Sequence, residues 1–311
     1  MVGIAFTIMC LVFGTTFLAI KIGVEAGMPP FLSAGLRFVI AGALMFTWMW
    51  MKGKVNLSLL FRKEMLITGA GLTFGTFATL YWAEQHVSSG VGAILSATGP
   101  LMIMLMQTAL LQQKTSARMI TGCLIGFTGV VLVVLPGVSL GAGSLFLWGC
   151  IAVLVGEMCY SAGTLYSKKV IHQFSEMSPV AINAVQMMYG GVLLFILSAL
   201  TETWNMSALD VLPAVSSVIY LTVIGSMVGH SLFYWIMSRT NPLFPATWLY
   251  ISPPIAVGLG AIVYGEHVSW VTWIGVVLVI SGLLAMNEKV SRWLKKKPVT
   301  GVGQAPESVL K

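Results

Sequence analysis

Apolar residues form long runs along most of the chain, and short breaks containing polar residues, glycine or proline separate these runs. A run of about 20 apolar residues is long enough for an α-helix to cross the hydrocarbon core of a membrane, which is roughly 30 Å thick. The chain is therefore predicted to be an all-α polytopic membrane protein with ten transmembrane helices. The expected spans are 2–21, 31–51, 65–84, 88–111, 117–135, 144–167, 179–200, 212–237, 243–264 and 270–287.

The second half of the chain repeats features of the first half. Tyr81-Trp82 leads to Gly99-Pro100, and at the same spacing Tyr234-Trp235 leads to Ser252-Pro253, a shift of 153 positions. An earlier pair of segments matches at a slightly smaller shift, which places Pro30, Arg37, Ala41 and Gly42 on Pro179, Gln186, Gly190 and Gly191. We interpret the chain as a tandem duplication. The expected domains are a first five-helix repeat (1–140), a second five-helix repeat (141–289) and a basic tail (290–311).

Composition supports a membrane protein and changes the meaning of the net charge. Of the residues, 57% are hydrophobic and only 9% are charged, and the mean hydropathy is +0.91. These values lie far from those of a soluble globular protein. The net charge of +7 would suggest a nucleic-acid partner in a soluble chain, but here we expect none, because the basic residues follow the loops. The four cysteines lie in apolar runs and are interpreted as small packing residues.

The distribution of basic residues predicts the orientation. With a cytoplasmic N-terminus, 15 of the 17 Lys and Arg residues fall in cytoplasmic loops or the C-terminal tail. The protein is expected in the inner membrane of the cell. Both of its termini are expected on the cytoplasmic side. Each repeat has five helices, an odd number, so the second repeat must be inverted relative to the first. Two inverted five-helix repeats are typical of alternating-access transporters.

Several short motifs resemble the EamA-type carriers of the drug/metabolite transporter superfamily. The resemblance covers residues 3–288 and rests on Phe13-Gly14-Thr15-Thr16-Phe17 with Ala19-Ile20-Lys21, on Pro30 with Leu36-Arg37-Phe38, on the helix around Pro100, and on Tyr264-Gly265-Glu266 leading to Gly275 and Gly282. It implies ten helices around a central cavity and export of metabolites or amino acids. No residue of the sequence itself indicates the direction of transport.

Two pairs of residues mark a candidate cavity at the middle of the membrane. Gly99 and Pro100 lie near the middle of the fourth span, and Ser252 and Pro253 lie near the middle of the ninth span. Proline removes a backbone hydrogen bond, and interrupted helices in a membrane usually line protein or water rather than lipid. Interruptions at equivalent depths of two inverted repeats indicate a binding site. The alternative is a kink that serves packing alone.

Glu157 and His230 are the two candidate proton-exchanging groups. Glu157 lies near the centre of the sixth span, where a charge is costly and apolar surroundings favour the protonated form. It is predicted to carry a proton or to bind a cationic group of the substrate; the alternative is a structural hydrogen bond. His230, deep in the eighth span, could accept a proton, bind substrate or bond to another helix.

The remaining candidates for the substrate site are polar or aromatic residues within spans. Asn183 and Gln186 could orient a polar substrate or join two helices. Arg37 could bind a carboxylate through two parallel hydrogen bonds, or its side chain could extend to the membrane surface, as we expect for Lys21. Trp248 and Tyr250 are expected to form walls of the cavity. Aromatic belts at the membrane surface account for the two Tyr-Trp pairs.

These features favour a secondary carrier of small amphipathic metabolites, such as amino acids or drug-like compounds. The expected partners are the substrate, protons and lipid; no cofactor is expected. The chain contains no P-loop motif for ATP, and no HExxH, no G-x-S-x-G and no pair of aspartates that would indicate an intramembrane enzyme. A channel or a non-transporting scaffold remains the alternative. The expected cavity suits a zwitterion with an apolar side chain.

Overall fold

The computed structural model describes residues 1–87, 89–110, 112, 115–137, 143–204, 209–255 and 269–286, and within these ranges the regular structure is helical, without strands. The helices of the first half are α1 (Val2–Glu25), α2 (Pro30–Met51), the 3₁₀ helix η1 (Leu57–Phe61), α3 (Lys63–Thr68), η2 (Gly69–Gly75), α4 (Thr76–Ala83), α5 (Ser89–Ser96), α6 (Gly99–Leu110), α7 (Ala117–Val134) and the 3₁₀ turn η3 (Leu135–Gly137).

The second half begins with two long helices and ends with shorter ones. Its helices are α8 (Ser144–Gln173), α9 (Pro179–Thr201), α10 (Val211–Tyr220), η5 (Leu221–His230), α11 (Ser231–Arg239), α12 (Leu243–Ala246) and α14 (Trp270–Met286). Residues 248–255 are also helical. Each of the ten expected spans therefore contains helix in the described residues. Whether all ten cross the membrane, and whether the repeats are inverted, stay predictions.

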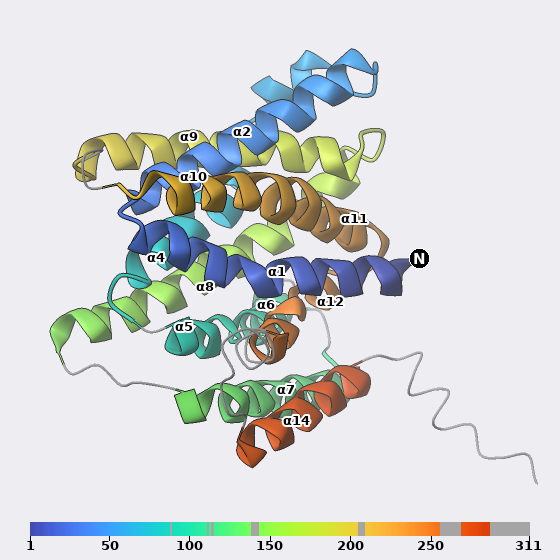
Figure 1. The fold of residues 1–311 in the computed structure, drawn as a ribbon. Coiled ribbons are helices and arrows are strands. Elements are labelled where there is room, and N and C mark those ends of the chain that lie inside the picture. The colour runs from blue at the N-terminus through green and yellow to red at the C-terminus, as the bar shows by residue number, and fades with distance from the viewer. Residues whose placement is uncertain are drawn as a thin grey trace, which may run out of the picture.

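The helices form three layers (Figure 1). In that view α2 and α9 pack together at the top, α7 and α14 pack together at the bottom, and the other helices lie between them. Glycine allows both outer pairs to approach closely. A Cβ added at Gly42 would lie 2.5 Å from the carbonyl oxygen of Ala184, and one at Gly282 would lie 2.5 Å from the nitrogen of Gly126. Such small-residue contacts are the usual way in which membrane helices associate.

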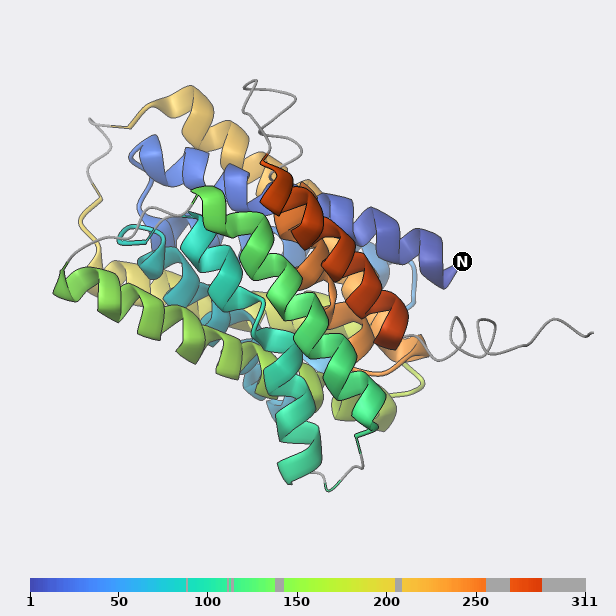
Figure 2. The ribbon, with the colours of Figure 1, turned by 90° about the horizontal axis from the view of Figure 1, so that it is seen from below.

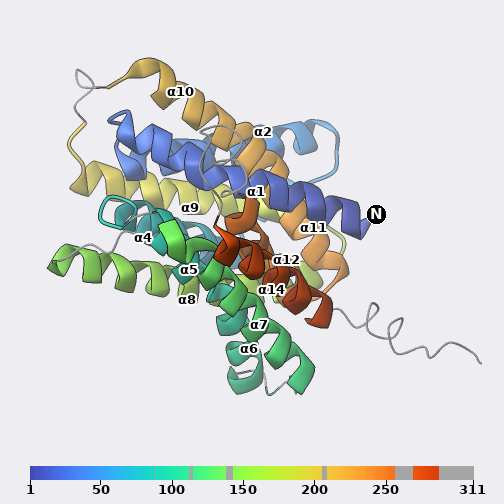
Figure 3. The same ribbon diagram turned by 60° about the horizontal axis from the view of Figure 1, so that its bottom comes forward.

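The middle layer contains helices that run in opposite directions. Figures 1 and 2 show that α1 and α8 are antiparallel, so that their C-terminal ends lie at opposite ends of the bundle. Seen from below, α7 and α14 lie side by side (Figure 2). Between α7 and α8 lie α5 and α6, and α12 contacts α6 (Figure 3).

Two helical runs contain a π-helical segment at equivalent positions. The segment η2 joins α3 to α4, and η5 joins α10 to α11, each without a break in the helix. A shift of 153 places residues 69–75 on 222–228, within η5. In the first segment, the hydroxyl of Thr76 donates to the carbonyl of Gly71, five residues earlier (3.3 Å). Wide turns of this kind are rare and often occur at functional sites.

Prolines begin both α2 and α9, and hydrogen bonds join the start of α2 to the residue that follows α9. Pro30 and Pro179 each occupy a first helical position, where the missing N–H costs nothing. The carboxylate of Glu202, just after α9, accepts hydrogen bonds from the backbone N–H groups of Phe31 (2.7 Å) and Leu32 (3.0 Å). The carboxylate thus accepts from N–H groups that have no partner within α2, and it lies at the positive end of the α2 dipole.

Five helical segments of the described residues are long and apolar enough to cross a membrane: Val2–Glu25, Pro30–Met51, Ser144–Gln173, Pro179–Thr201 and Val211–Arg239. Large apolar side chains also cover the outside of the bundle; Leu44, Trp48, Trp273 and Val277 are each more than half exposed. A surface of this kind is stable in lipid and not in water. The helices therefore form a multi-pass membrane protein.

Candidate functional site

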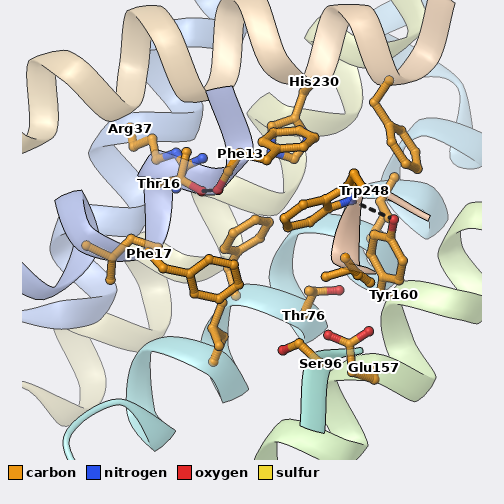
Figure 4. Close-up of a pocket in the computed structure, with 16 residues that line it drawn as sticks. Phe13, Thr16, Phe17, Arg37, Thr76, Ser96, Glu157, Tyr160, His230 and Trp248 are labelled. Carbon is orange, nitrogen blue, oxygen red and sulfur yellow. Dashed lines mark hydrogen bonds between the residues drawn. The ribbon is translucent and has the colours of Figure 1, made fainter. Parts of the chain in front are cut away.

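A cavity lies in the middle layer of the bundle (Figure 4). Its volume is about 620 Å³, including space that is open to the outside. Every long helical run of the middle layer contributes to its wall, and the lining is mostly aromatic and aliphatic. The lining residues are Phe13, Thr16, Phe17, Ile20, Arg37, Leu72, Thr76, Phe77, Leu80, Ser96, Glu157, Tyr160, His230, Phe233, Trp248 and Leu249.

Arg37 provides the positive charge of the cavity. It lies on α2, and its side chain is only 1% exposed. Its Nε donates to the hydroxyl of Ser226 at 2.7 Å, and Nη1 makes a long hydrogen bond of 3.5 Å to the hydroxyl of Tyr81. The guanidinium also lies over the rings of Phe38 (4.7 Å) and Phe77 (5.2 Å). No carboxylate of the described residues forms an ion pair with it.

Glu157 is the acidic residue of the cavity. It lies on α8, 6% exposed, beside Ser96 (Figure 4). Its carboxylate covers the start of α6, where a Cβ added at Gly99 would overlap Oε2. This oxygen is buried and has no hydrogen-bond partner among the described residues, nor does a cation of that part of the chain pair with the carboxylate. Glycine at position 99 is therefore required for the carboxylate to reach this place.

Aromatic rings form the wall between these charges. The indole of Trp248 packs against the rings of Phe13, at a centroid distance of 4.5 Å, and Phe17, at 6.2 Å. Its Nε1 donates to the hydroxyl of Tyr160 (3.2 Å), which fixes the plane of the indole (Figure 4). Trp248 thus lies where it was expected, and it offers an apolar face to the cavity.

His230, at the end of η5, is enclosed by aromatic rings. Its ring lies 5.2 Å from that of Phe13, 5.6 Å from that of Phe38 and 5.8 Å from that of Phe77. Its Nε2 is buried and has no hydrogen-bond partner in the described part of the chain. In the described part of the chain His230 therefore makes no hydrogen bond through Nε2 to another helix. Its side chain lines the cavity instead.

The two interrupted helices meet at the cavity, but the interruptions do not lie at the prolines. The first break is Ala97-Thr98, so Pro100 lies in the first turn of α6, where proline is tolerated. The second break is Thr247, six residues before Pro253, which lies within helix. Neither proline is therefore the point of interruption: Pro100 needs no kink in the first turn of its helix, and Pro253 lies within the helix that follows the second break.

The carbonyls at these breaks already have partners. The hydroxyl of Thr98 donates to the carbonyl of Leu95 (2.6 Å), and that of Thr247 donates to the carbonyl of Phe244 (2.7 Å). Ser161 Oγ donates to the carbonyl of Gly99 (3.2 Å). The breaks therefore shape the cavity rather than offer vacant acceptors to a substrate.

Seven of the expected site residues are not part of the cavity lining: Gly99, Pro100, Asn183, Gln186, Tyr250, Ser252 and Pro253. Gln186 accepts a hydrogen bond from Thr73 Oγ1 (2.7 Å) and donates to Asn183 Oδ1 (3.0 Å), so this pair joins α9 to η2. Tyr250 packs on Gly126 of α7 and donates its hydroxyl proton to the carbonyl of Cys123 (3.2 Å). Ser252 is buried but is not part of the lining.

Sequence reasoning missed the residues that hold Arg37. Tyr81 and its counterpart Tyr234 are fully buried rather than part of an interfacial belt. Tyr81 bonds to Arg37, and Tyr234 bonds to Ser167 of α8 (3.0 Å). The repetition of the Tyr-Trp pair in both halves was the available signal. No group of three or more His, Cys, Asp or Glu side chains among the described residues could hold a metal ion.

Apolar helices around a buried, charged cavity are the architecture of a membrane transporter, and comparisons with known proteins agree. The chain belongs to the EamA-like transporter family, which matches residues 1–135 and 147–287. The family and the names of the relatives indicate a transporter rather than an enzyme.

The chain is similar over most of its length to several curated proteins. It is 27% identical to the "Uncharacterized inner membrane transporter YedA" of Escherichia coli strain K12, covering 89% of this chain and 87% of that protein. It is 25% identical to a "Probable amino-acid metabolite efflux pump" of Salmonella typhimurium, covering 88% and 90%. A solved crystal structure with 20% identity has the same fold, with a TM-score of 0.74 over 94% of this chain and 98% of that chain.

Proposed function

We propose that this protein is a secondary carrier that exports small zwitterions with an apolar side chain, amino acids above all, across the inner membrane by alternating access. The observation that carries the proposal is the pair of opposite charges in one cavity. Arg37 and Glu157 are both buried, and neither forms an ion pair within the described residues.

Each of these charges is costly without a partner. Removing an isolated ion from water costs several kcal/mol, and a partner or a change of protonation must offset this cost. An α-amino acid brings both partners: its carboxylate suits the guanidinium of Arg37, and its ammonium group suits the carboxylate of Glu157. Without substrate, Glu157 is expected to hold a proton, so that binding of the ammonium group displaces that proton.

The shape and lining of the cavity favour an apolar side chain. Most of the residues that line it are aromatic or aliphatic, as is usual for small-molecule sites. Trp248 and Phe13 offer aromatic faces, which suit a hydrocarbon or ring better than a sugar or a polyanion. We therefore expect apolar amino acids, including tryptophan, to bind better than sugars or polyanions.

Two further features support alternating access and export. Equivalent helices, such as α1 and α8, run in opposite directions, as inverted repeats require (Figure 1). Export is supported by a relative named as a probable amino-acid metabolite efflux pump. We also propose that both termini lie in the cytoplasm, because the basic loops of inner-membrane proteins stay on that side.

Transport by the purified protein in liposomes tests the proposal. A labelled apolar amino acid, tryptophan, should exchange faster when unlabelled tryptophan is present on the opposite side, because a carrier returns loaded. A channel would show no such acceleration. Tryptamine, which lacks the carboxylate, and N-acetyltryptophan, which lacks the ammonium group, should compete at least about tenfold more weakly, since each leaves one buried charge unpaired. Equal competition by all three compounds would contradict the proposed site.

Glu157→Gln should abolish the acceleration of transport by a pH gradient while the protein stays folded. Cys10→Ser is the matched control, because Cys10 occupies the corresponding position of α1 and is also buried. Wild-type rates and pH dependence in Glu157→Gln would assign this carboxylate a structural role instead.

A further inference from the structure

Lys168 closes one end of the middle layer. It lies in α8, and its Nζ donates to the backbone carbonyls of Met237 (2.7 Å), Thr240 (2.9 Å) and Ser238 (3.4 Å) at the end of α11. The last carbonyls of a helix lack partners within the helix and carry the negative end of its dipole, so they attract a cation. The adjacent hydrogen bond between Ser167 and Tyr234 joins the same two helices.

Lys21 is the counterpart of Lys168 in the first half. A shift of 147 places α1 on α8, with Phe13 on Tyr160 and Lys21 on Lys168. The structure supports this match, because Phe13 and Tyr160 both contact Trp248. The helices α1 and α8 are antiparallel (Figures 1 and 2). Each lysine lies near the C-terminal end of its helix, so the two lysines lie at opposite ends of the bundle.

Lys21 makes no comparable contact in this structure. Its Nζ lies 3.7 Å from a carboxylate oxygen of Glu25, and the two side chains are 49% and 66% exposed. Such a surface pair contributes little. The end of α4, which corresponds to the end of α11 by the shift of 153, therefore has no lysine bound to it in the described residues.

A buried carboxylate lies where that lysine would bind. Glu84 directly follows α4, and both of its carboxylate oxygens are buried without a hydrogen-bond partner in the described part of the chain. A buried carboxylate with no partner is expensive, so Glu84 is an acceptor ready for a cation.

The cavity extends further along α1 than along α8. Ile20, next to Lys21, lines it, whereas the lining residue of α8 nearest to Lys168 is Tyr160, about two turns away. Leu80 of α4 and its counterpart Phe233 of α11 both line it. The wall formed by α8 thus ends well before Lys168, while the wall formed by α1 reaches the residue beside Lys21.

We propose that Lys168 and Lys21 are alternate latches of the transport cycle. In the conformation seen here Lys168 holds the end of α11. In the opposite conformation Lys168 leaves α11, and Lys21 binds Glu84 at the end of α4, which closes the cavity at that end. This inference rests on the proposed alternating access. It assigns a function to three charged residues that do not form part of the cavity lining.

Distances between spin labels in lipid nanodiscs, without substrate, test the latches. One label pair replaces Ile22 and Gln85 at the Lys21 end, and another replaces His172 and Asn241 at the Lys168 end; the four native cysteines are replaced first. Lys168→Ala should lengthen the distance at its own end and shorten the other. The ratio of the two conformations should change about tenfold, the effect of losing a charge-assisted hydrogen bond. Lys169→Ala, which removes an exposed neighbouring charge, is the matched control.

The double variant Lys168→Ala/Glu84→Gln identifies the second latch. Removing the charge of Glu84 should return the distances to those of the wild type, whereas Glu25→Gln in place of Glu84→Gln should not. Lys168→Arg should keep the wild-type distances, which shows that the position is tolerant and that folding is intact.

Three results would overturn the inference: wild-type distances in Lys168→Ala, an equal shift in Lys169→Ala, or no reversal by Glu84→Gln. Because the measurement uses no substrate, its outcome is separate from that of the transport assay. The expected shifts in a protein that transports no amino acid would uphold the latches and reject the proposed substrate.

Discussion

Arg37 of α2 and Gln186 of α9 occupy equivalent positions in the two halves, and each is hydrogen-bonded to an equivalent hydroxyl. Arg37 bonds to Ser226 of η5, and Gln186 bonds to Thr73 of η2; a shift of 153 places Thr73 on Ser226. The two contacts join equivalent positions of equivalent helices, but the side chains differ in charge. Arg37 carries a charge to the cavity, whereas Gln186 is sealed in a neutral contact with Asn183.

The negative charge shows the opposite asymmetry. Glu157 of α8 lines the cavity, while the corresponding residue of α1 is Cys10, which is buried outside it. The first half thus contributes the cation and the second half the carboxylate. Under the proposed alternating access the two halves would exchange mechanical roles, whereas a site with one cation and one anion would hold a zwitterion in a single orientation. The positions of the hydrogen-bonded residues are thus alike in the two halves, whereas the charged residues of the cavity are not.

The largest effect is expected from cysteine labelling that tests whether the two halves are inverted, because each cysteine should either react from outside or not react at all. Single cysteines at Gly27, Gly137 and Ser207 should react with an impermeant reagent from outside, and those at Lys54, Ser116 and Lys296 should not, because basic loops stay in the cytoplasm. Ser207 and Lys296 lie outside the described residues. Labelling of Gly137 and Ser116 from the same side would show that α7 does not cross the membrane, and the halves could not be inverted.

Exchanging the chemistry of the equivalent positions should give the next largest effect. Arg37→Gln should weaken apparent affinity for substrate by about 30-fold or more, since losing one partner of a buried charge pair costs on the order of 2 kcal/mol or more. Its thermal stability should change little. Gln186→Met should do the reverse, because it leaves the Thr73 hydroxyl and Asn183 unpaired. Competition assays and thermal melting separate the two. Equal losses of affinity would remove the functional difference between the halves.

The wall of the cavity should discriminate by size. Trp248→Ala is expected to weaken the largest apolar amino acids by about 1–3 kcal/mol and to change alanine little, because only large side chains reach the removed indole. Competition by a series from alanine to tryptophan measures this. Tyr250→Phe is the control, since its hydroxyl faces Cys123 and not the cavity. A loss that is uniform across the series would indicate a general defect, and no loss would remove Trp248 from the site.

The smallest expected effect compares the two equivalent hydroxyls. Ser226→Ala should raise KM about threefold with kcat unchanged, because Arg37 keeps its charge but loses one hydrogen bond that orients it. Thr73→Val should lower stability by about 1 kcal/mol and leave KM unchanged. A rise in KM in both variants would mean that Gln186 also acts on the substrate.

Much of the fold could be predicted from the sequence because the relevant signals are local. Length and hydropathy define where an apolar helix lies, and Pro30 and Pro179 mark helix starts, as the structure confirms. Arg37, Glu157, His230 and Trp248 were identified as unusual within apolar spans, and all four line the cavity. A charged or hydrogen-bonding group at membrane depth needs a partner, so its presence alone indicates a site.

The faces of the helices could not be predicted in the same way. In a soluble protein the polar side of a helix shows which side is buried, but lipid is as apolar as a protein core, so both sides of a membrane helix look alike. This explains why Tyr250 was expected in the cavity that Phe13 and Tyr160 in fact line. The position of the helix breaks was also set by packing, at Ala97-Thr98 and Thr247, rather than by the prolines.

The sequence by itself determined the all-helical membrane class and the approximate places of the helices, because both depend on the order and type of neighbouring residues, and it predicts the repetition of the halves. Only the tertiary structure decided which distant residues meet. Arg37 and Ser226 lie 189 positions apart, and Lys168 and Thr240 lie 72 apart. Contacts of this kind depend on how the helices pack and rotate against one another, and close packing through glycine leaves no trace in hydropathy.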